Sequence, residues 1–229
     1  MTNPLDVVIP TLDAAATLPR TLAAVREVGR HLPSTITVCD GGSRDATVAI
    51  ARQSGAAVVT APPGRGGQLA AGAAAGSAPW LLFLHADTVP GSGWIEAVQR
   101  FVAAPANLAK AGYFRLRLES TDTRARRIER LADWRCRTLG LPYGDQGLLM
   151  ARSFYRQLGG FRPLPLMEDV DLVRRIGRRR LVPLEACAVT SAMRYERDGW
   201  LARPARNLTC LALYFAGVPP RVILQLYGR

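Results

Sequence analysis

An α/β fold with a mostly parallel central sheet and flanking helices is predicted by three observations on the sequence. Short apolar runs alternate with helical patterns in the first half, several of these runs end in an acidic residue, and 229 residues fit one α/β domain. Such alternation implies parallel strands joined by right-handed crossovers, as in a Rossmann-like sheet. The hydrophobic fraction of 48% is sufficient for a core. We therefore expect a single domain over residues 1–229, with halves at 1–110 and 111–200 and a helical tail at 201–229.

The first half contains four predicted strands, which are short runs rich in apolar and β-branched residues. They cover residues 5–9, 35–39, 56–60 and 80–84. Pro10 is expected to end the first strand, since proline has no N–H to donate to a ladder. Three helices are predicted between the strands, at residues 15–32, 43–54 and 68–75. Ser43 or Asp45 is expected to cap the second of these helices.

The second half is less regular. Strands are expected at residues 111–118 and 147–151, and helices at residues 94–103, 121–139, 153–158 and 168–179. The tail, at residues 201–227, has the pattern of one or two amphipathic helices broken at Pro219 and Pro220.

The predicted strand at residues 80–84 ends in His85-Ala86-Asp87, and this is the most informative stretch of the chain. Its unbroken apolar run is typical of a buried parallel strand, which delivers the following residues to the sheet edge where open α/β folds bind ligands. Residues i and i+2 of an extended chain point to the same side, so His85 and Asp87 could face one ligand or one metal ion. The alternative is that Asp87 only caps the following turn.

Two further acidic residues follow predicted strands, namely Asp13 and Asp40. Because the carboxyl ends of parallel strands meet at one edge, we expect both residues near Asp87. A carboxylate at this edge can accept hydrogen bonds from a nucleotide base or a ribose. The alternatives are structural, with Asp40 in a turn with Gly41 and Asp13 as a helix N-cap.

Residues 62–67 form a glycine-rich loop ahead of the third predicted helix. The loop matches neither a P-loop nor a dinucleotide-binding fingerprint. Its backbone N–H groups and Arg65 suit a diphosphate bound near a helix N-terminus. A plain surface turn is the alternative.

The second half contains two acidic motifs. Residues 168–171 hold three acids in four residues at a predicted helix start, where they either complement the helix dipole or act on a substrate. Residues 144–147 have the sequence Gly-Asp-Gln-Gly and indicate either a turn or part of a binding site.

The chain is strongly basic, with a formal charge of +12, and Lys110 is its only lysine. Arginine suits bidentate phosphate and carboxylate contacts, although an arginine-rich codon bias would give the same composition. An anionic membrane surface or a phosphate-bearing substrate is compatible with this charge. No nucleic-acid-binding motif is present, so we expect no nucleic-acid partner.

The four cysteines are far apart and form no metal-type pair, which favours a reducing cytoplasm. The first residues show no signal-peptide pattern, and the longest apolar stretch, at residues 208–218, has about half the length that a bilayer needs. We expect a cytoplasmic protein whose tail contacts the inner face of the membrane through apolar residues and nearby arginines. Packing of the tail on the sheet or in a homodimer is the alternative.

Five segments of the chain resemble the motifs of family 2 glycosyltransferases, and they come in the family's order. Residues 7–13 resemble the opening strand and base pocket, residues 38–47 the second nucleotide element, and residues 64–72 the loop near the diphosphate. Residues 83–88 stand where the family has its Asp-x-Asp metal motif, and residues 167–175 resemble the Glu-Asp motif with the catalytic base. The resemblance covers about residues 5–180 and implies a GT-A fold.

The resemblance implies an inverting, non-processive transfer of one sugar from a UDP- or GDP-linked donor to an unidentified acceptor hydroxyl, with a lipid-like acceptor following from the membrane prediction. It implies Asp169 as the catalytic base, Asp87 as a ligand of Mn²⁺ or Mg²⁺, and His85 as an alternative second ligand. The residues implied to bind the nucleotide sugar are Pro10, Thr11, Asp13, Asp40, Gly41, Arg65, Gln68, His85, Ala86 and Asp87. Those implied to face the acceptor or the donor sugar are Asp145, Gln146 and Glu168.

Two departures from the family pattern bear on these expectations. His85 replaces the first acid of the metal motif, and a neutral imidazole suits Mn²⁺ better than Mg²⁺. The Gln-x-x-Arg-Trp motif of processive synthases is absent, and residues 191–195 occupy a comparable position without matching it. Two other classes remain compatible with the sequence, a sugar-phosphate nucleotidyltransferase and a non-catalytic basic protein that binds a membrane surface.

Overall fold

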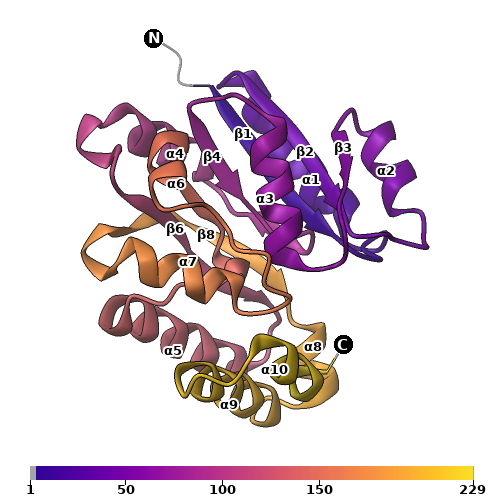
Figure 1. The fold of residues 1–229 in the computed structure, drawn as a ribbon, viewed down its shortest axis with the longest axis vertical. Helices are drawn as coiled ribbons and strands as arrows, with labels where there is room; N and C mark the ends of the chain where they lie inside the picture. The colour runs from indigo at the N-terminus through magenta and orange to yellow at the C-terminus, as the bar shows by residue number, and fades with distance from the viewer. Residues whose placement is uncertain (1–3, 229) are drawn as a thin grey trace.

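A single eight-stranded sheet forms the centre of the computed structural model, which describes residues 4–228 (Figure 1). Its strands are β1 (Leu5–Thr11), β2 (Ser34–Asp40), β3 (Ala57–Thr60), β4 (Trp80–Phe83), β5 (Thr88–Pro90), β6 (Ala111–Glu119), β7 (Leu148–Ala151) and β8 (Leu181–Ser191). Their order across the sheet is β3-β2-β1-β4-β7-β6-β8-β5. The neighbours among β1 to β4 pair in parallel, as do β6 and β8, which confirms the predicted mostly parallel α/β fold.

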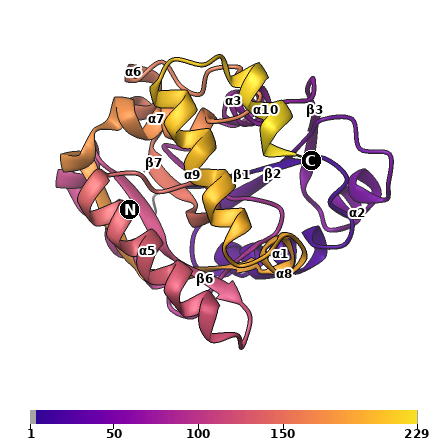
Figure 2. The same ribbon diagram turned by 90° about the horizontal axis from the view of Figure 1, so that it is seen from below.

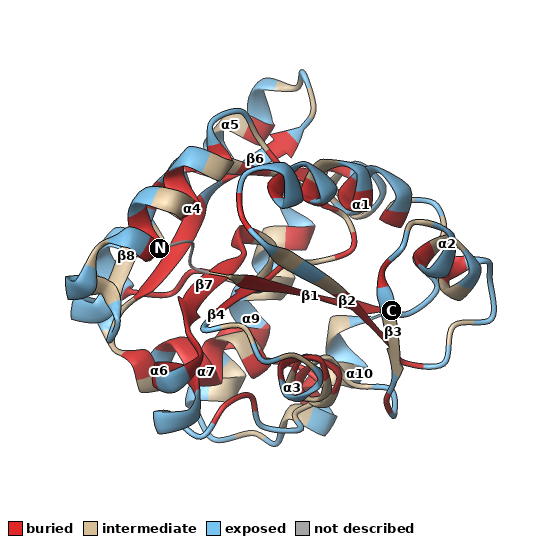
Figure 3. Ribbon diagram, turned by 90° about the horizontal axis from the view of Figure 1, so that it is seen from above, coloured by how far each residue is buried: buried red, intermediate tan, exposed pale blue. Residues whose placement is uncertain are grey.

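Helices cover both faces of this sheet. They are α1 (Leu18–Arg26), α2 (Thr47–Gln53), α3 (Arg65–Ala75), α4 (Trp94–Ala103), α5 (Thr123–Leu139), α6 (Arg152–Gln157), α7 (Glu168–Ile176), α8 (Met193–Asp198), α9 (Ala202–Phe215) and α10 (Pro220–Tyr227). Figure 3 shows α1 and α4 on one face and α3, α6 and α7 on the other, with their buried sides turned toward the sheet. This arrangement leaves the carboxyl ends of β1, β2 and β4 free to form a site.

The central strands are buried along their whole length because helices cover both faces. Every residue of β1 and of β4 is buried, including Val7, Val8, Leu81 and Leu82, which are fully inaccessible to solvent. The unbroken apolar run at residues 80–84 is therefore a buried parallel strand, as expected.

The prediction that Pro10 ends the first strand is wrong, because β1 continues to Thr11. On one side, β1 remains paired with β2 as far as Thr11 and Asp40. On the other side, its pairing with β4 ends at Val8. Pro10 therefore lies beyond the part of β1 that pairs with β4, and its missing N–H costs the sheet no hydrogen bond. For this reason the strand tolerates the proline.

The helix boundaries also differ from those predicted. The helix expected at 15–32 is shortened to α1 and followed by a 3₁₀ turn, Glu27–Arg30. The one expected at 43–54 begins only at Thr47, with Ala46 at the N-cap position, so neither Ser43 nor Asp45 is its N-cap. Asp45 accepts a hydrogen bond from the Thr47 N–H in the turn just before the helix. The first turn of α3 includes part of the predicted glycine-rich loop, and α7 ends at Ile176, ahead of Gly177. Gly177 has a φ of +81°, which favours glycine and ends the helix.

The strands predicted at residues 111–118 and 147–151 are confirmed as β6 and β7, whereas β5 and β8 were not expected from the sequence. With eleven residues, β8 is the longest strand of the described chain. Its buried positions alternate through Leu184, Ala186, Ala188 and Thr190. Small residues and Pro183 weaken the strand signal, so that only this period-2 alternation could have revealed it.

The C-terminal tail forms two helices, α9 and α10, which separate near Pro219 and Pro220 as predicted. Cys210, Leu211 and Ile223 are buried in the main hydrophobic core, so the tail packs against the rest of the domain. Figure 2 shows α9 lying between α5 and α10. No helix among residues 4–228 is both long and apolar enough to cross a bilayer.

Candidate active site

A cleft of about 290 Å³ lies beyond the end of β4 and is enclosed by segments that are distant in the sequence. One side comes from the β4 end and the first turns of α3 and α7, and the other from α5, α8, α9 and α10. Its polar lining includes Arg65, His85, Asp87, Asp145, Glu168, Asp169, Arg194 and Tyr227. Six of the fourteen residues that the sequence analysis assigned to the site are thus brought together in one place, namely Arg65, His85, Asp87, Asp145, Glu168 and Asp169.

His85 and Asp87 both line this cleft, as their spacing predicts. The turn that carries them begins where the Leu84 N–H donates to the Val8 carbonyl, at 3.0 Å, and continues β4 toward the cleft. Ala86 between them is buried, and its carbonyl accepts a hydrogen bond of 3.0 Å from the Thr21 hydroxyl. The Asp87 carboxylate has no hydrogen bond or ion pair within residues 4–228, so it remains available to a ligand.

The imidazole of His85 is neutral at physiological pH. Burial and, to a smaller extent, the nearby positive charge of Arg65 together lower the pKa of His85 to about 4, against the opposing effect of Asp87. A neutral imidazole can coordinate a metal ion or accept a hydrogen bond.

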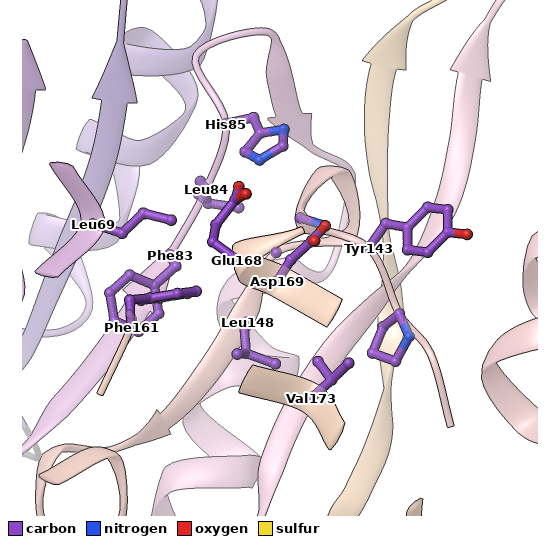
Figure 4. A pocket seen from close by; sticks show the side chains of 13 residues that line it. Leu69, Phe83, Leu84, His85, Tyr143, Leu148, Phe161, Glu168, Asp169 and Val173 are labelled. Atoms are coloured by element: carbon purple, nitrogen blue, oxygen red, sulfur yellow. The ribbon is translucent and has the colours of Figure 1, made fainter. Parts of the chain in front are cut away.

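Gly144 lies between His85 and Asp169, at a position where only glycine fits. A Cβ at this position would lie 2.4 Å from His85 Nε2, closer than any side chain permits. The Gly144 N–H donates to Asp169 Oδ2 at 2.7 Å, and the Val170 N–H donates to Asp169 Oδ1 at 2.7 Å. Figure 4 shows His85 and Asp169 close together, with Glu168 beside them. The Gly-Asp-Gln-Gly motif is therefore part of the site, and its first glycine orients the predicted base.

Glu168 is buried, with 1% of its surface exposed, and neither carboxylate oxygen has a hydrogen-bond partner among the described residues. The nearest cation is Arg65, with its Nη1 at 3.7 Å from Glu168 Oε1. Burial raises the pKa of Glu168 to about 7, although Arg65 opposes this shift. Met167, just before it, has a φ of +65°, a strained conformation for a non-glycine residue and one that clusters at functional sites.

The third acid of this motif has a structural role. Asp171 is buried and forms ion pairs with Arg162 at 3.0 Å and with Arg175. Its charge is therefore already neutralised by the protein. Of the three acids at the start of α7, only Glu168 and Asp169 face the cleft.

Replacing Glu168 with glutamine should make the stability of the ligand-free protein less dependent on pH. A carboxyl group whose pKa is raised in the folded state stabilises the fold below its unfolded pKa and loses this contribution as the pH rises through about 7. The free energy of unfolding of Glu168→Gln relative to the wild type should therefore rise between about pH 4.5 and 7.5, by on the order of 3 kcal/mol.

Denaturant unfolding of both proteins across this pH range measures the difference. Glu185→Gln is the matched control, because Glu185 is exposed and pairs with Arg100 at the surface. Identical pH profiles for Glu168→Gln and the wild type would show that burial does not shift the pKa of Glu168.

Asp145 and Gln146, both expected near the acceptor or the donor sugar, have different positions. Asp145 lines the cleft with a buried Oδ1 that has no hydrogen-bond partner in the described chain, and burial raises its pKa to about 6. Gln146 does not line the cleft. Its amide donates to the Phe114 carbonyl at 3.0 Å, and its Oε1 accepts from Arg135 Nη2 at 2.9 Å. Gln146 therefore holds the loop in place, which corrects the expectation of a ligand contact.

Two of the residues expected to bind the nucleotide are engaged within the protein instead. Asp40 accepts hydrogen bonds from the N–H groups of Gly42 and Ser43 and from the hydroxyls of Thr11 and Ser43. Gln68 donates from Nε2 to the carbonyls of Thr11 at 2.7 Å and of Cys39 at 2.8 Å. Both side chains hold the ends of β1 and β2 together, so the structural alternative for Asp40 is the one observed.

The backbone edge that these side chains organise includes Pro10, Thr11, Asp13 and Gly41. The Gly41 N–H donates to the Thr11 carbonyl at 2.9 Å, which joins the two strand ends. Asp13 is exposed, has a φ of +49°, and accepts a hydrogen bond of 2.7 Å from the Arg44 N–H. Asp13 therefore lies at the rim of the sheet edge and does not cap α1.

Arg65 opens α3 and extends into the cleft. Burial acts to lower its pKa, but Glu168, Tyr227 and Asp169 outweigh that effect and raise it, so the guanidinium is always charged. Tyr227 belongs to α10, lines the same cleft and is close enough to Arg65 to affect its pKa. The C-terminal helix thus contributes directly to the site, which the sequence pattern did not indicate.

Three other cleft residues were not identified from the sequence. They are Arg135 in α5, Arg194 in α8 and Arg203 in α9. Arg194 is exposed, and no carboxylate among residues 4–228 forms an ion pair with it. In the sequence, the only indication that this segment belongs to the site was its position, since residues 191–195 stand where processive synthases have their motif. Nothing else indicated it, because α8 and α9 are brought to the cleft only by the tertiary fold.

The fold and the site together define a class of protein. A mostly parallel sheet carries Asp87 and His85 beyond the end of β4, and Asp169 lies close to His85 at the same cleft. The chain belongs to glycosyl transferase family 2, whose model matches residues 6–159. It is therefore a glycosyltransferase. No curated protein matches the sequence significantly.

Solved structures show the same fold. Glucosyl-3-phosphoglycerate synthase from Mycobacterium tuberculosis, in complex with Mn²⁺, UDP and glucosyl-3-phosphoglycerate, is similar with a TM-score of 0.67 and 20% identity over 95% of this chain and 81% of that chain. A second structure of that enzyme, with Mg²⁺ and UDP, gives a TM-score of 0.59 and 20% identity over 82% of this chain and 70% of that one. S. aureus TarS gives a TM-score of 0.60 and 13% identity over 93% of this chain and 40% of that chain.

Proposed function

We propose that this protein transfers one sugar from a nucleoside diphosphate sugar to an acceptor hydroxyl, with inversion at the anomeric carbon and with the help of a divalent cation. The observation that carries the proposal is the single cleft in which Asp87 and His85, at the end of β4, face Asp169, at the start of α7. UDP in the similar mycobacterial structures favours a uridine donor over a guanosine one. A sugar-phosphate nucleotidyltransferase and a non-catalytic membrane-binding protein are less well supported, because family membership and a base-containing cleft favour glycosyl transfer.

A divalent cation fits the residues at the β4 end. Asp87 has a carboxylate without a partner in the described chain, and His85 beside it is neutral. No three histidine, cysteine or acidic residues within residues 4–228 form a complete metal cluster, so oxygens of the donor would complete the coordination. The mycobacterial structures contain Mn²⁺ or Mg²⁺, and an imidazole ligand favours Mn²⁺ here. When bound, the cation neutralises the leaving diphosphate.

Asp169 is positioned to remove the proton of the acceptor hydroxyl. Hydrogen bonds from the Gly144 and Val170 N–H groups, each 2.7 Å long, fix its carboxylate at the cleft. The acceptor oxygen then forms a bond to the anomeric carbon as the bond to the diphosphate breaks, and the acceptor proton passes to Asp169. Such a single displacement inverts the anomeric centre.

Two cations of the cleft lie where they can stabilise the diphosphate. Arg65 is the first residue of α3 and lines the cleft, and Arg194 is close enough to His85 to affect its pKa. Guanidinium groups bind phosphate oxygens in a bidentate manner. The sheet edge at Pro10, Asp13 and Gly41 would then receive the base and ribose.

A thermal-shift screen of nucleotides and nucleotide sugars with and without Mn²⁺ tests this function. A ligand at 100 times its dissociation constant adds about 2.7 kcal/mol to the free energy of unfolding. We expect a Mn²⁺-dependent rise in melting temperature with UDP or a UDP-sugar, and slow donor hydrolysis by the same preparation. Absence of any nucleotide effect under both conditions would reject the proposal.

We further propose a cytoplasmic enzyme that contacts the inner face of the membrane peripherally. This proposal is supported by large apolar side chains that stay exposed on the tail beside arginines, namely Phe215, Val222 and Leu226 near Arg206 and Arg221. Apolar side chains flanked by basic ones are typical of interfacial helices.

Co-sedimentation with anionic liposomes at low salt should show binding, and Val222→Ser/Leu226→Ser should weaken it because these side chains provide the apolar contact. Leu108→Ser is the matched control, since Leu108 is exposed outside the tail. Absence of wild-type binding would leave a purely cytosolic enzyme. Sedimentation velocity without lipid tests the predicted homodimer.

A further inference from the structure

The cleft has two chemically different parts. The part beside β4 and α7 contains most of the charged groups described above. The part between α5 and α9 is lined mainly by apolar side chains, with Arg135, Arg203 and Asn207 as its polar members. We call this second part the apolar arm, which consists of Ile128, Leu131, Trp134, Leu139, Leu208 and Leu211. Both parts belong to one continuous cleft, whose lining includes residues of both α5 and α9.

Four of the six side chains of the apolar arm are exposed, whereas Ile128 is half-buried and Leu211 is buried. Leu131 is 62% exposed, Trp134 57% and Leu208 60%. Single exposed apolar residues are common on protein surfaces, but a contiguous group around a cleft marks a binding site. Here the group faces the same cleft as Asp169, so the exposed hydrocarbon is continuous with the site of chemistry.

Two of the four arginines that line the cleft, Arg135 on α5 and Arg203 on α9, are already paired within the protein. Arg135 donates to the Leu141 carbonyl at 2.8 Å and to Gln146 at 2.9 Å, and stacks on the Tyr143 ring. Arg203 pairs with Asp198 at 3.3 Å and stacks on the Tyr227 ring. A phosphate or carboxylate on the acceptor would therefore find no free guanidinium at Arg135 or Arg203. Arg194 has no ion-pair partner among residues 4–228, but it is close enough to His85 to act on it and so lies near the donor end of the cleft.

We infer that the acceptor is an alcohol attached to an apolar hydrocarbon body, with its hydroxyl at Asp169 and its body in the apolar arm. This inference rests on the proposed function and names the chemical class of its second substrate. The cleft volume of about 290 Å³ is close to the lower limit of small-molecule sites, roughly 300–1,000 Å³. A long hydrocarbon would thus extend beyond the arm over the exposed leucines.

Direct binding of bromoalcohols to the wild-type protein tests the inference without any sugar donor. The chain has four tryptophans, and Trp80, Trp94 and Trp200 are at most 9% exposed, so bromine in the arm should quench mainly Trp134. From 4-bromobutanol to 10-bromodecanol, affinity should increase about two- to fourfold per methylene until the arm is filled. Trp134→Phe should remove most of the quenching.

Matched leucine variants locate the binding site. Leu131→Ser and Leu208→Ser should each weaken 10-bromodecanol binding at least tenfold, because each places a hydroxyl against the hydrocarbon. Leu108→Ser should bind as the wild type does, since Leu108 is exposed outside the cleft. A chain-length dependence that is lost only in the two arm variants supports the inference.

Three results would overturn it. Glycerol or glycerol 3-phosphate could bind as tightly as the long alcohols, quenching could persist unchanged in Trp134→Phe, or the wild type could be a dimer that the arm variants dissociate. Mn²⁺-dependent UDP binding by the same wild-type protein keeps the two proposals apart. If UDP binds and the alcohols do not, only the inference about the acceptor fails, whereas loss of UDP binding rejects the proposed function itself.

Discussion

Asp169→Asn should lose sugar transfer while keeping its affinity for the donor. Asparagine has the shape of aspartate and can keep the hydrogen bond of 2.7 Å from Gly144, but it cannot take the proton of the acceptor. Loss of a general base typically reduces the rate by about 10²–10⁴. Single-turnover transfer at saturating donor measures this loss, and nucleotide thermal shifts on the same protein measure donor affinity.

The structure limits where the base could be if this expectation is wrong. Asp171 is buried and paired with Arg162 and Arg175, so it cannot replace Asp169 without breaking two ion pairs. Asp145 lines the cleft with an unpartnered Oδ1 and a pKa raised to about 6, within the range useful for a base. Near-normal transfer by Asp169→Asn, together with a large loss of transfer by Asp145→Asn, would show that Asp145 is the general base.

Asp87→Ala should abolish the Mn²⁺-dependent part of donor binding and leave the fold intact. Asp87 has the one carboxylate of the β4 motif and makes no hydrogen bond or ion pair within residues 4–228, so its removal breaks no internal contact. In the wild type, a donor at 100 times its dissociation constant should add about 2.7 kcal/mol to the free energy of unfolding, and the variant should lose this gain.

Thermal shifts with UDP at several Mn²⁺ concentrations compare the two proteins. The matched control is Asp133→Ala, which removes an acid on α5 that pairs with Arg137 outside the cleft. Unchanged Mn²⁺ dependence in Asp87→Ala would show that Asp87 does not hold the cation. His85→Ala then distinguishes a metal ligand from a donor contact, since loss of a ligand shifts the Mn²⁺ concentration needed and not only the affinity for UDP.

The nucleotide end of the site shows where local sequence patterns are informative and where they are not. The pattern identified Asp13, Asp40 and Asp87 as acids at strand ends, and all three follow neighbouring parallel strands. It did not show that the carboxylate of Asp87 is free whereas that of Asp40 is not. The Asp40 carboxylate accepts hydrogen bonds from Gly42, Ser43 and Thr11. Hydrogen-bond partners 29 residues apart, such as Thr11 and Asp40, are not visible in a local motif.

By itself the sequence determined the parallel half of the sheet, the adjacent placement of His85 and Asp87, and the acidic start of α7. These features depend on period-2 and period-3.6 patterns and on strand ends, which are local properties of the chain. Tertiary structure alone decided that Gly144 would separate His85 from Asp169, that Gln146 would serve the loop, and that α5, α9 and Tyr227 would enclose the cleft. The reason is that these contacts join segments far apart in the chain, and their burial becomes favourable only once the whole fold has formed.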